Sequence, residues 1–237
     1  MTPLPFSPDN DGVDDELSIA IEVEDLSPIS SWSMAIDDPV GHLFTTFSGY
    51  GSPTERIIWD GLSYNGELVQ AAQDYGLRFW IQDNLGNAKR LERVIPVDVL
   101  VIREGNKLKV RISSITFPPN SPDLSAVQDE EKITINNRTI NRLAEIFTKY
   151  NTYQIRIEGH ANNLSWADPA KAAVEEVEEL VPLSSARAAA VKEALVDQGL
   201  QASRISTTGL GGKYPVVPFS DIENRWKNRR VEFILVK

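Results

Sequence analysis

The chain has 237 residues, of which 41% are hydrophobic and 24% charged, with a formal net charge of −10 and no cysteine. These values are ordinary for a globular protein and argue against a fibrous or disordered one. The length exceeds that of a usual single domain, so we expect two domains, each large enough for its own core. Without cysteine the chain can form no disulfide, thiolate zinc site or thiol nucleophile.

Charge is divided unevenly along the chain. Residues 1–100 contain 5 Lys and Arg against 17 Asp and Glu, whereas residues 101–237 contain 19 against 17. Because phosphate contacts need clustered cations, and the second part has no long basic stripe, we expect no nucleic-acid partner.

No segment has the pattern of a membrane span. The longest apolar runs, such as residues 97–102, are far shorter than the roughly 18 to 20 residues that a span requires. Residues 1–5 lack the charged and apolar regions of a signal peptide. We therefore expect no transmembrane segment in this chain, and any export signal or lipid anchor to lie outside it.

Apolar residues alternate with polar ones in the first part of the chain, which predicts short β-strands. The alternating sets are Leu17, Ile19, Ile21 and Val23; Trp32, Met34 and Ile36; and Tyr75, Leu77, Phe79 and Ile81. Residues 62–72 lack this pattern and predict a turn-rich connection. The spacing of the strands favours a small β-sandwich.

Three motifs in this part occur in a fixed order. They are the segment from Phe6 to Asp15 (FSPDNDGVDD), Trp59-Asp60-Gly61, and Gly66 to Val69 followed by Tyr75. Over about residues 4–100 they resemble the immunoglobulin-like domain related to that of the flagellar hook-capping protein. The resemblance implies an immunoglobulin-like β-sandwich, which we expect over residues 1–104.

The acidic turn around Gly12 raises the question of calcium, which prefers clustered carboxylate oxygens. Alignment of Gly12 with the turn glycine of an EF-hand loop places Ser7 first and Ser18 at the bidentate glutamate position, so that motif is absent. We expect no metal site and interpret the segment as a solvated turn, with a calcium site as the alternative.

From about Asn106 the pattern changes to alternating strands and helices. Strands are predicted over residues 110–117, 153–158, 204–208 and 230–236, and helices over residues 133–150 and 183–198, the second closed by Gly199. This order predicts a mixed α+β or α/β sheet with helices on one face. We expect this second domain over residues 105–237, joined to the first without a flexible linker.

Several spaced motifs in the second domain belong together. They are Gly159-His160-Ala161-Asn162, Leu183 to Ala188 (LSSARA), Arg204-Ile205, Gly209-Leu210-Gly211, Pro215, and Asn228 to Glu232 (NRRVE). Over about residues 110–237 they resemble the OmpA-like peptidoglycan-binding family. The resemblance implies a domain that grips the diaminopimelate of a peptidoglycan stem with an aspartate and an arginine.

The match is incomplete at the positions that would hold the ligand. The arginine is present as Arg187, but Asn162 replaces the aspartate, Ala161 the preceding threonine, and Leu180 a family asparagine. Asn228 and Arg230 fall at the corner that borders the family's pocket, where one of Arg229 and Arg230 is expected to be structural because alternate strand residues face opposite ways.

Replacing the aspartate by an amide should weaken recognition of diaminopimelate. A carboxylate and a guanidinium together suit a ligand that carries an ammonium and a carboxylate. A charged hydrogen bond contributes about 1.5 to 3 kcal/mol against about 1 for a neutral one, so we expect a loss of about tenfold or more in affinity.

The interval between the motifs is about ten residues longer than is usual for the family, and residues 168–180 predict an added acidic helix beside the site. One interpretation is that this helix supplies a substitute anion or covers the pocket; the other is a solvated acidic face. The candidate anions are Asp168, Glu178 and Glu179, with Glu175 and Glu176 as further possibilities.

Other residues have structural explanations. Arg187 lies in the first turn of a helix, where a cation is disfavoured, so we expect it to contact either a ligand or a glutamate of the added helix. His160 has no second histidine or cysteine at ligand spacing and is interpreted as a satisfied structural histidine. Gly209 to Gly212 followed by Lys213 lacks Walker spacing and is interpreted as a turn.

The sequence therefore predicts a non-enzymatic protein of the periplasm, in the envelope of a diderm bacterium, with no cofactor. Its fold class is an immunoglobulin-like β-sandwich followed by an OmpA-like α+β domain. Peptidoglycan is the expected partner, with binding weak or absent at ordinary diaminopimelate stems. The alternatives are a retargeted or compensated peptidoglycan site and a scaffold that binds another envelope protein.

Overall fold

The computed structural model describes residues 1–105 and 107–237 and divides into two compact units, Met1–Leu100 and Val101–Lys237. Asn106, where we placed the change of pattern, lies outside the described residues. Within those residues, no helix combines the length and the apolar character that crossing a bilayer demands.

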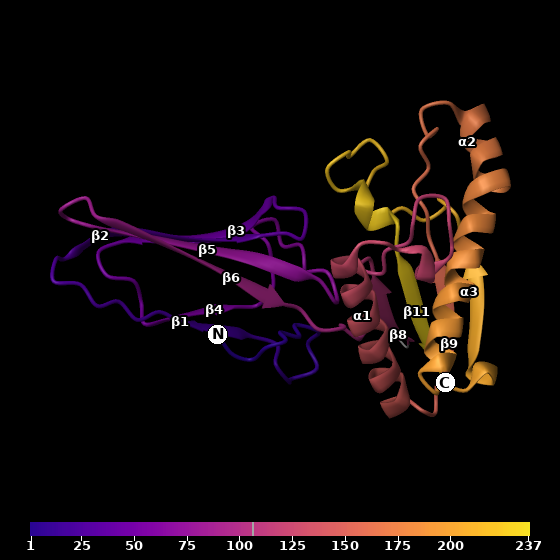
Figure 1. The fold of residues 1–237 in the computed structure, drawn as a ribbon, viewed down its shortest axis with the longest axis horizontal. Helices are drawn as coiled ribbons and strands as arrows, with labels where there is room; N and C mark the ends of the chain where they lie inside the picture. The colour runs from indigo at the N-terminus through magenta and orange to yellow at the C-terminus, as the bar shows by residue number, and fades with distance from the viewer. Residues whose placement is uncertain (106) are drawn as a thin grey trace. The chain divides into compact units, whose positions relative to one another are not determined.

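Two antiparallel sheets build the first unit (Figure 1). The larger has the strand order β3-β2-β5-β6, and β1 pairs with β4 in the smaller. The strands are β1 Leu17–Ala20, β2 Ile29–Asp37, β3 Leu43–Tyr50, β4 Arg56–Trp59, β5 Asp74–Asp83 and β6 Ala88–Pro96. This unit is therefore all-β, as the alternation predicts.

The alternating residues mostly face the core of this unit. Trp32, Met34 and Ile36 are buried along β2. The prediction for the first strand was too long, because Ile21 and Val23 lie beyond β1 and outside the core. Strand β6 has no alternation and was not predicted; nearly all of it is exposed at the edge of the sheet, with Lys89, Arg90 and Arg93 along it.

Aromatic rings fill the interior of the first unit. Trp59 lies between Phe6 and Phe44, with ring centroids 5.4 and 6.3 Å away, and Phe44 meets Tyr75 edge-on at 5.0 Å. The buried Tyr75 hydroxyl accepts a hydrogen bond from Gln70 N–H at 2.9 Å. Burial raises the pKa of Tyr75, so the phenol stays neutral. The motifs around Phe6, Trp59 and Tyr75 thus meet in one core.

The second unit contains a five-stranded mixed sheet with the order β10-β9-β11-β8-β7, in which β9 and β10 pair in parallel and the other neighbouring strands pair antiparallel. Its strands are β7 Ile102–Glu104, β8 Lys107–Ile112, β9 Gln154–Gly159, β10 Ile205–Gly209 and β11 Val231–Val236. Its helices are α1 Glu130–Lys149, α2 Pro169–Glu175, the π-helix η2 Glu176–Leu180 and α3 Val181–Asp197, with short 3₁₀ turns η1 Leu124–Ala126, η3 Ala202–Arg204 and η4 Arg225–Asn228.

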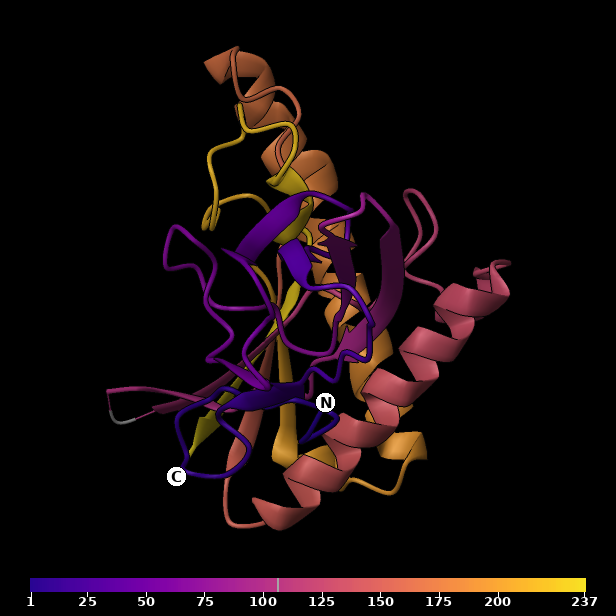
Figure 2. The same ribbon diagram turned by 90° about the vertical axis from the view of Figure 1, so that its left-hand side faces the viewer.

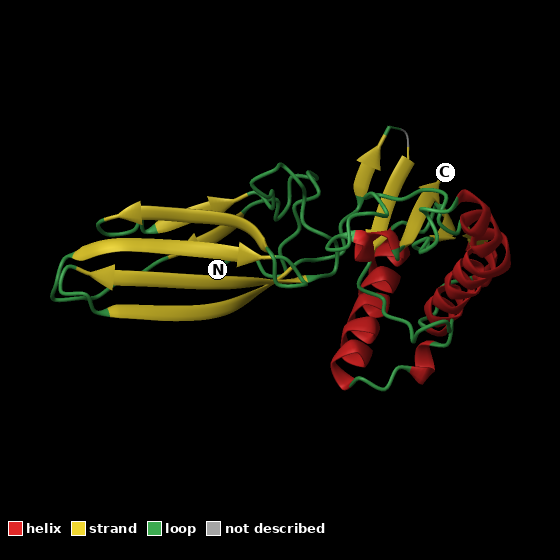
Figure 3. Cartoon of the chain, turned by 90° about the horizontal axis from the view of Figure 1, so that it is seen from above, coloured by secondary structure: helices red, strands yellow, loops and turns green. Residues whose placement is uncertain are grey.

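Helices α1 and α3 cover one face of this sheet (Figure 3). Phe147 of α1 packs against Phe233 of β11 at 5.2 Å between ring centroids, and both rings are buried. Helix α1 begins at the N-cap Asp129, and α3 ends before Gly199, whose φ of +95° suits glycine. The mixed sheet with helices on one face agrees with the prediction for this half of the chain.

The predicted strand over residues 110–117 is partly wrong, because β8 ends at Ile112 and residues 113–118 form no regular strand. The added helix over residues 168–180 is present as α2 and η2. These continue without a break into α3, so that the three form one long rod (Figure 2). Asp168 caps its start by accepting hydrogen bonds from Ala170 and Lys171 N–H.

We expect Phe233→Ala to lower the free energy of unfolding of the second unit by about 3 to 5 kcal/mol, because it removes a fully buried ring and leaves a cavity under Phe147. Urea denaturation followed by circular dichroism measures the change. Val236→Ala, on the same strand but 40% exposed, is the control and should cost less than about 1 kcal/mol. Equal losses for the two variants would contradict the proposed packing.

Candidate ligand-binding site

Strands β9 and β11 place three pairs of polar residues opposite one another. Glu158 lies opposite Glu232 in the antiparallel register. The next pair on this face is His160 with Arg230, where His160 N–H donates to the carbonyl of Arg230 at 3.0 Å. The third pair is Asn162 with Asn228, where Asn228 Nδ2 donates to Asn162 Oδ1 at 3.1 Å. Because alternate strand residues share a face, these pairs lie on the face turned away from Phe233 and the helices.

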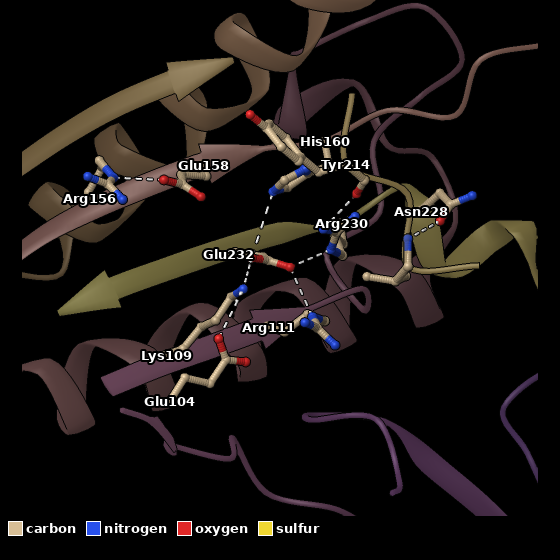
Figure 4. A network of polar contacts seen from close by, with 11 residues as sticks. Glu104, Lys109, Arg111, Arg156, Glu158, His160, Tyr214, Asn228, Arg230 and Glu232 are labelled. Carbon is tan, nitrogen blue, oxygen red and sulfur yellow. Dashed lines mark hydrogen bonds and ion pairs between the residues drawn. The ribbon is translucent and has the colours of Figure 1, made fainter. Parts of the chain in front are cut away.

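Glu232 is the centre of a charge network on this face (Figure 4). Its carboxylate contacts Lys109 Nζ at 2.6 Å, Arg111 Nε at 2.9 Å and Arg230 Nε at 2.6 Å. Burial alone would raise the pKa of Glu232, but the charge of Arg230 and the hydrogen bonds from Lys109 and Arg230 lower it to about 2. Glu232 is therefore ionised and is held by three cations.

His160 is buried, as its interpretation as a structural histidine implies. Within the described residues neither ring nitrogen has a hydrogen-bond partner, and Nε2 lies 3.9 Å from Glu232 Oε2. Burial, and then the charge of Arg230, lower the pKa of His160 to about 4, so the ring is neutral at pH 7. The sequence motif predicted the burial but not the absence of partners.

Glu158, His160 and Glu232 bring their ligand atoms within 4.8 Å of one another, as a metal site would. The two oxygens of Glu232, however, are already engaged by Lys109, Arg111 and Arg230. Three cations at this distance oppose a divalent ion, and no thiolate or second histidine joins the group. The donor set does not suit a metal.

The Asn162–Asn228 pair has a fixed orientation. Asn228 Oδ1 accepts hydrogen bonds from Val216 and Val217 N–H at 2.8 and 3.1 Å, so Asn228 must present its Nδ2 to Asn162. Asn162 then presents Oδ1 to Asn228 and turns its own Nδ2 away, where that atom has no acceptor in the part of the chain that the structure describes. Asn162 is 6% exposed and Asn228 is fully buried. The position that carries the family's aspartate is thus neutral and covered.

Arg187 does not contact a glutamate of the added helix, as one of the two predictions required. Its Nε and Nη2 donate to the carbonyls of Ser121 and Pro118, both at 3.2 Å, and its guanidinium lies 5.0 Å from the ring centroid of Phe117. Burial, and then the charge of Arg229, lower the pKa of Arg187. Among the described residues Arg187 forms no ion pair, so its charge is not neutralised within the domain.

Three of the remaining predicted positions are buried. Ala161 is buried, and its N–H donates to Gly211 O at 2.8 Å. Leu180 is buried in η2. Arg230 is buried, with Nη2 donating to Tyr214 O at 3.1 Å, whereas Arg229 is exposed. No hydrogen bond or ion pair joins Arg187 to Asn162 in the described part of the chain.

Three acidic residues of the added helix bind backbone N–H groups. Asp168 caps α2, and Glu175 accepts hydrogen bonds from the N–H groups of Leu164 and Ser165 at 3.0 and 2.8 Å. Glu176 accepts one from Gly212 at 2.9 Å. Glu178 and Glu179 are exposed.

Glu176 explains part of the glycine motif after β10. A Cβ at Gly211 would overlap Glu176 Oε1, and one at Gly212 would lie 3.1 Å from Oε2. The turn was predicted from the glycines, but its partner was not, because nothing in the sequence links Glu176 to a turn 36 residues away.

The acidic turn of the first unit brings the carboxylates of Asp9, Asp11 and Asp15 within 4.8 Å of one another. Asp15 accepts hydrogen bonds from the N–H groups of Asn10 and Gly12, and Asp11 accepts one from Val13. These bonds account for the arrangement as a carboxylate-stabilised turn.

Residues 116–229 match the model of the OmpA family, so the second unit carries an OmpA-family domain. The matched family model and the relative named for its association with peptidoglycan, a name that denotes no reaction, agree with the prediction that this chain is not an enzyme.

Curated relatives include the probable lipoprotein YiaD of Escherichia coli, 28% identical over 62% of this chain and 60% of that protein. The peptidoglycan-associated lipoprotein of Agrobacterium fabrum is 33% identical over 41% of this chain and 50% of that protein. The chain thus spans between half and three fifths of the length of these relatives.

Among solved structures, the chain is similar to a putative MotB-like protein from Desulfovibrio vulgaris, with 24% identity, a TM-score of 0.46, and coverage of 57% of this chain and 76% of that chain. The periplasmic domain of Helicobacter pylori MotB (residues 90–256) is 21% identical, with a TM-score of 0.46 and coverage of 58% and 78%.

The charge network predicts a stability that falls in acid. The pKa of His160 is about 4, below its usual 6.5, so unfolding takes up a proton and stability is lost as pH falls from about 6.5 to 4. Glu232, with a pKa of about 2 instead of 4.5, loses its contribution as pH falls from about 4.5 to 2. Across its pH range, each group changes the free energy of unfolding by about 3 kcal/mol.

Glu232→Gln should lower the free energy of unfolding of the second unit by about 3 kcal/mol at pH 7. It should also flatten the dependence of stability on pH below about pH 4.5.

Urea denaturation between pH 3 and 8 measures both effects. Glu104→Gln is the matched control, because Glu104 also faces Lys109 but is 54% exposed, and it should change stability by less than about 1 kcal/mol. A Glu232→Gln variant as stable as the original protein at pH 7 would show that the buried ion cluster contributes nothing.

Proposed function

We propose that this protein is a non-enzymatic component of the bacterial cell envelope that acts in the periplasm, where its OmpA-family domain associates with peptidoglycan through an altered site. We further propose an immunoglobulin-like β-sandwich over residues 1–104 and the modified OmpA-like domain over residues 105–237. The names of the relatives support peptidoglycan as the polymer concerned. Ordinary diaminopimelate stems should bind weakly or not at all.

The observation that carries this proposal is the state of Asn162. Its amide has no charge to attract an ammonium, its oxygen is engaged by Asn228, and the residue is buried. Arg187 keeps a positive charge with no acidic partner among the described residues, so the carboxylate-binding half of the clamp remains. A ligand that carries both an ammonium and a carboxylate therefore lacks a charged partner for its ammonium.

The idea that the added helix supplies a substitute for the missing carboxylate has less support. Asp168, Glu175 and Glu176 accept hydrogen bonds from backbone N–H groups that fix the helix to its own start and to the loops at residues 164–165 and 212. Only Glu178 and Glu179 remain exposed. We therefore favour an incomplete clamp over one completed from the insertion.

A second candidate function is a scaffold that binds another envelope protein through the first unit. The excess of acidic over basic residues in residues 1–100 supports a partner with a basic surface. Such a scaffold would bind no muropeptide, whereas a retargeted peptidoglycan site would bind a stem residue that carries only one of the two charged groups.

The test is calorimetry with diaminopimelate and co-sedimentation with purified sacculi. We expect weak or undetectable binding for the original chain and at least a tenfold gain for Asn162→Asp, because a carboxylate again faces the ammonium. Asn151→Asp adds the same charge at an exposed turn between α1 and β9 and should have no effect. Tight binding of diaminopimelate by the original chain would contradict the proposal.

A further inference from the structure

We propose that Asn162, His160, Arg230 and Ser113 form an anion-accepting site, which takes a small carboxylate and rejects an ammonium. This rests on the proposed function in one respect, since Asn162 is the altered family position, and it names the ligand chemistry that the alteration selects. The four residues come from three strands or their continuations, on the face of the sheet that the helices do not cover.

The strand register brings these residues side by side. His160 and Arg230 form one cross-strand pair, joined by the hydrogen bond from His160 N–H to Arg230 O. Ile112, the last residue of β8, lies opposite Val231, and Ser113 and Arg230 are the residues that adjoin this pair in the two chains. Asn162 occupies the next row, opposite Asn228. Arg230 is thus flanked by a serine, a histidine and an amide.

Each of these side chains has a buried polar atom without a partner among residues 1–105 and 107–237: Ser113 Oγ, the two ring nitrogens of His160, Asn162 Nδ2 and Arg230 Nη1. His160, Asn162 and Arg230 are each at least nine tenths buried. An unsatisfied buried polar group costs about 1 to 3 kcal/mol, so several together call for a common partner.

The unpartnered atoms are mainly donors. Arg230 already uses Nε for Glu232 and Nη2 for Tyr214 O, so both N–H bonds of Nη1 remain. Asn162 Nδ2 can only donate, because Asn228 fixes the orientation of the amide. The serine hydroxyl and one nitrogen of the neutral imidazole can donate as well. A partner for this group must therefore accept hydrogen bonds.

The surrounding charge favours an anion over water or a cation. Glu232 faces three cations, Lys109, Arg111 and Arg230, while Glu158 is paired with Arg156. Glu104 lies 3.7 Å from Lys109 but is largely exposed. The positive surroundings also contribute to the low pKa of His160. An aspartate at position 162 would supply a negative charge here. Because Asn162 is neutral, a bound anion can supply that charge instead.

The test is NMR titration of the two imidazoles of the intact chain, with sodium acetate as the probe and sodium chloride at equal ionic strength as the reference. A carboxylate bound beside His160 should raise its pKa by about one unit, because a nearby anion favours the imidazolium. His42, 48% exposed in the first unit, is the internal control and should show only the general effect of salt.

Two variants make the result specific. Asn162→Asp should raise the pKa of His160 without any added anion and remove the response to acetate, because the site then holds its own carboxylate. Ser113→Ala should weaken acetate binding severalfold, while Ser206→Ala, at an exposed position of β10, should not. If Asn162→Asp does not fold, the acetate response of the original chain and of Ser113→Ala still decides the question.

Equal His160 titrations in acetate and chloride, with ordered water alone at these atoms in a crystal, would overturn the inference. That outcome is separable from the failure of the proposed function. A restored diaminopimelate affinity in Asn162→Asp without any acetate response in the original chain would leave the proposed function intact and remove only the anion site.

Discussion

The antiparallel register between β9 and β11 is the constraint on which the site depends. It aligns Glu158 with Glu232, and its continuation aligns His160 with Arg230 and Asn162 with Asn228. A slip of β11 by one residue would turn Glu232, Arg230 and Asn228 to the face that packs against the helices, where Phe233 now meets Phe147. The apolar contact on one face therefore fixes the polar arrangement on the other.

The added helix depends on the same framework. Glu175 and Glu176, adjacent in the sequence, accept hydrogen bonds from the loop after β9 and from the turn after β10, respectively. The two loops follow β9 and β10, and the parallel pairing of these strands sets the distance between the loops. Because two neighbouring carboxylates bind two different loops, the rod formed by α2, η2 and α3 is fixed against the end of the sheet and is not merely a solvated acidic face.

Local patterns predicted the elements better than the partners. The helix over residues 133–150 and the strands around Trp32 and Tyr75 follow from apolar spacing, and the altered position 162 follows from the motif. Strand β6 escaped prediction because an exposed edge needs no alternation. The cations around Glu232 are partly visible in the sequence, since Lys107, Lys109 and Arg111 alternate with apolar residues in β8. Their contact with Glu232 depends on the pairing of β8 with β11, which one sequence does not reveal.

The exposed edge of β6 affects how copies of this protein can aggregate. An open edge presents free backbone groups on which a further strand could assemble into a continuous sheet. Lys89, Arg90 and Arg93 concentrate three of the five basic residues of the first hundred along this one strand. When two such edges approach each other, the repulsion between these cations, offset in part by Glu92, opposes the assembly of the first unit into insoluble polymers.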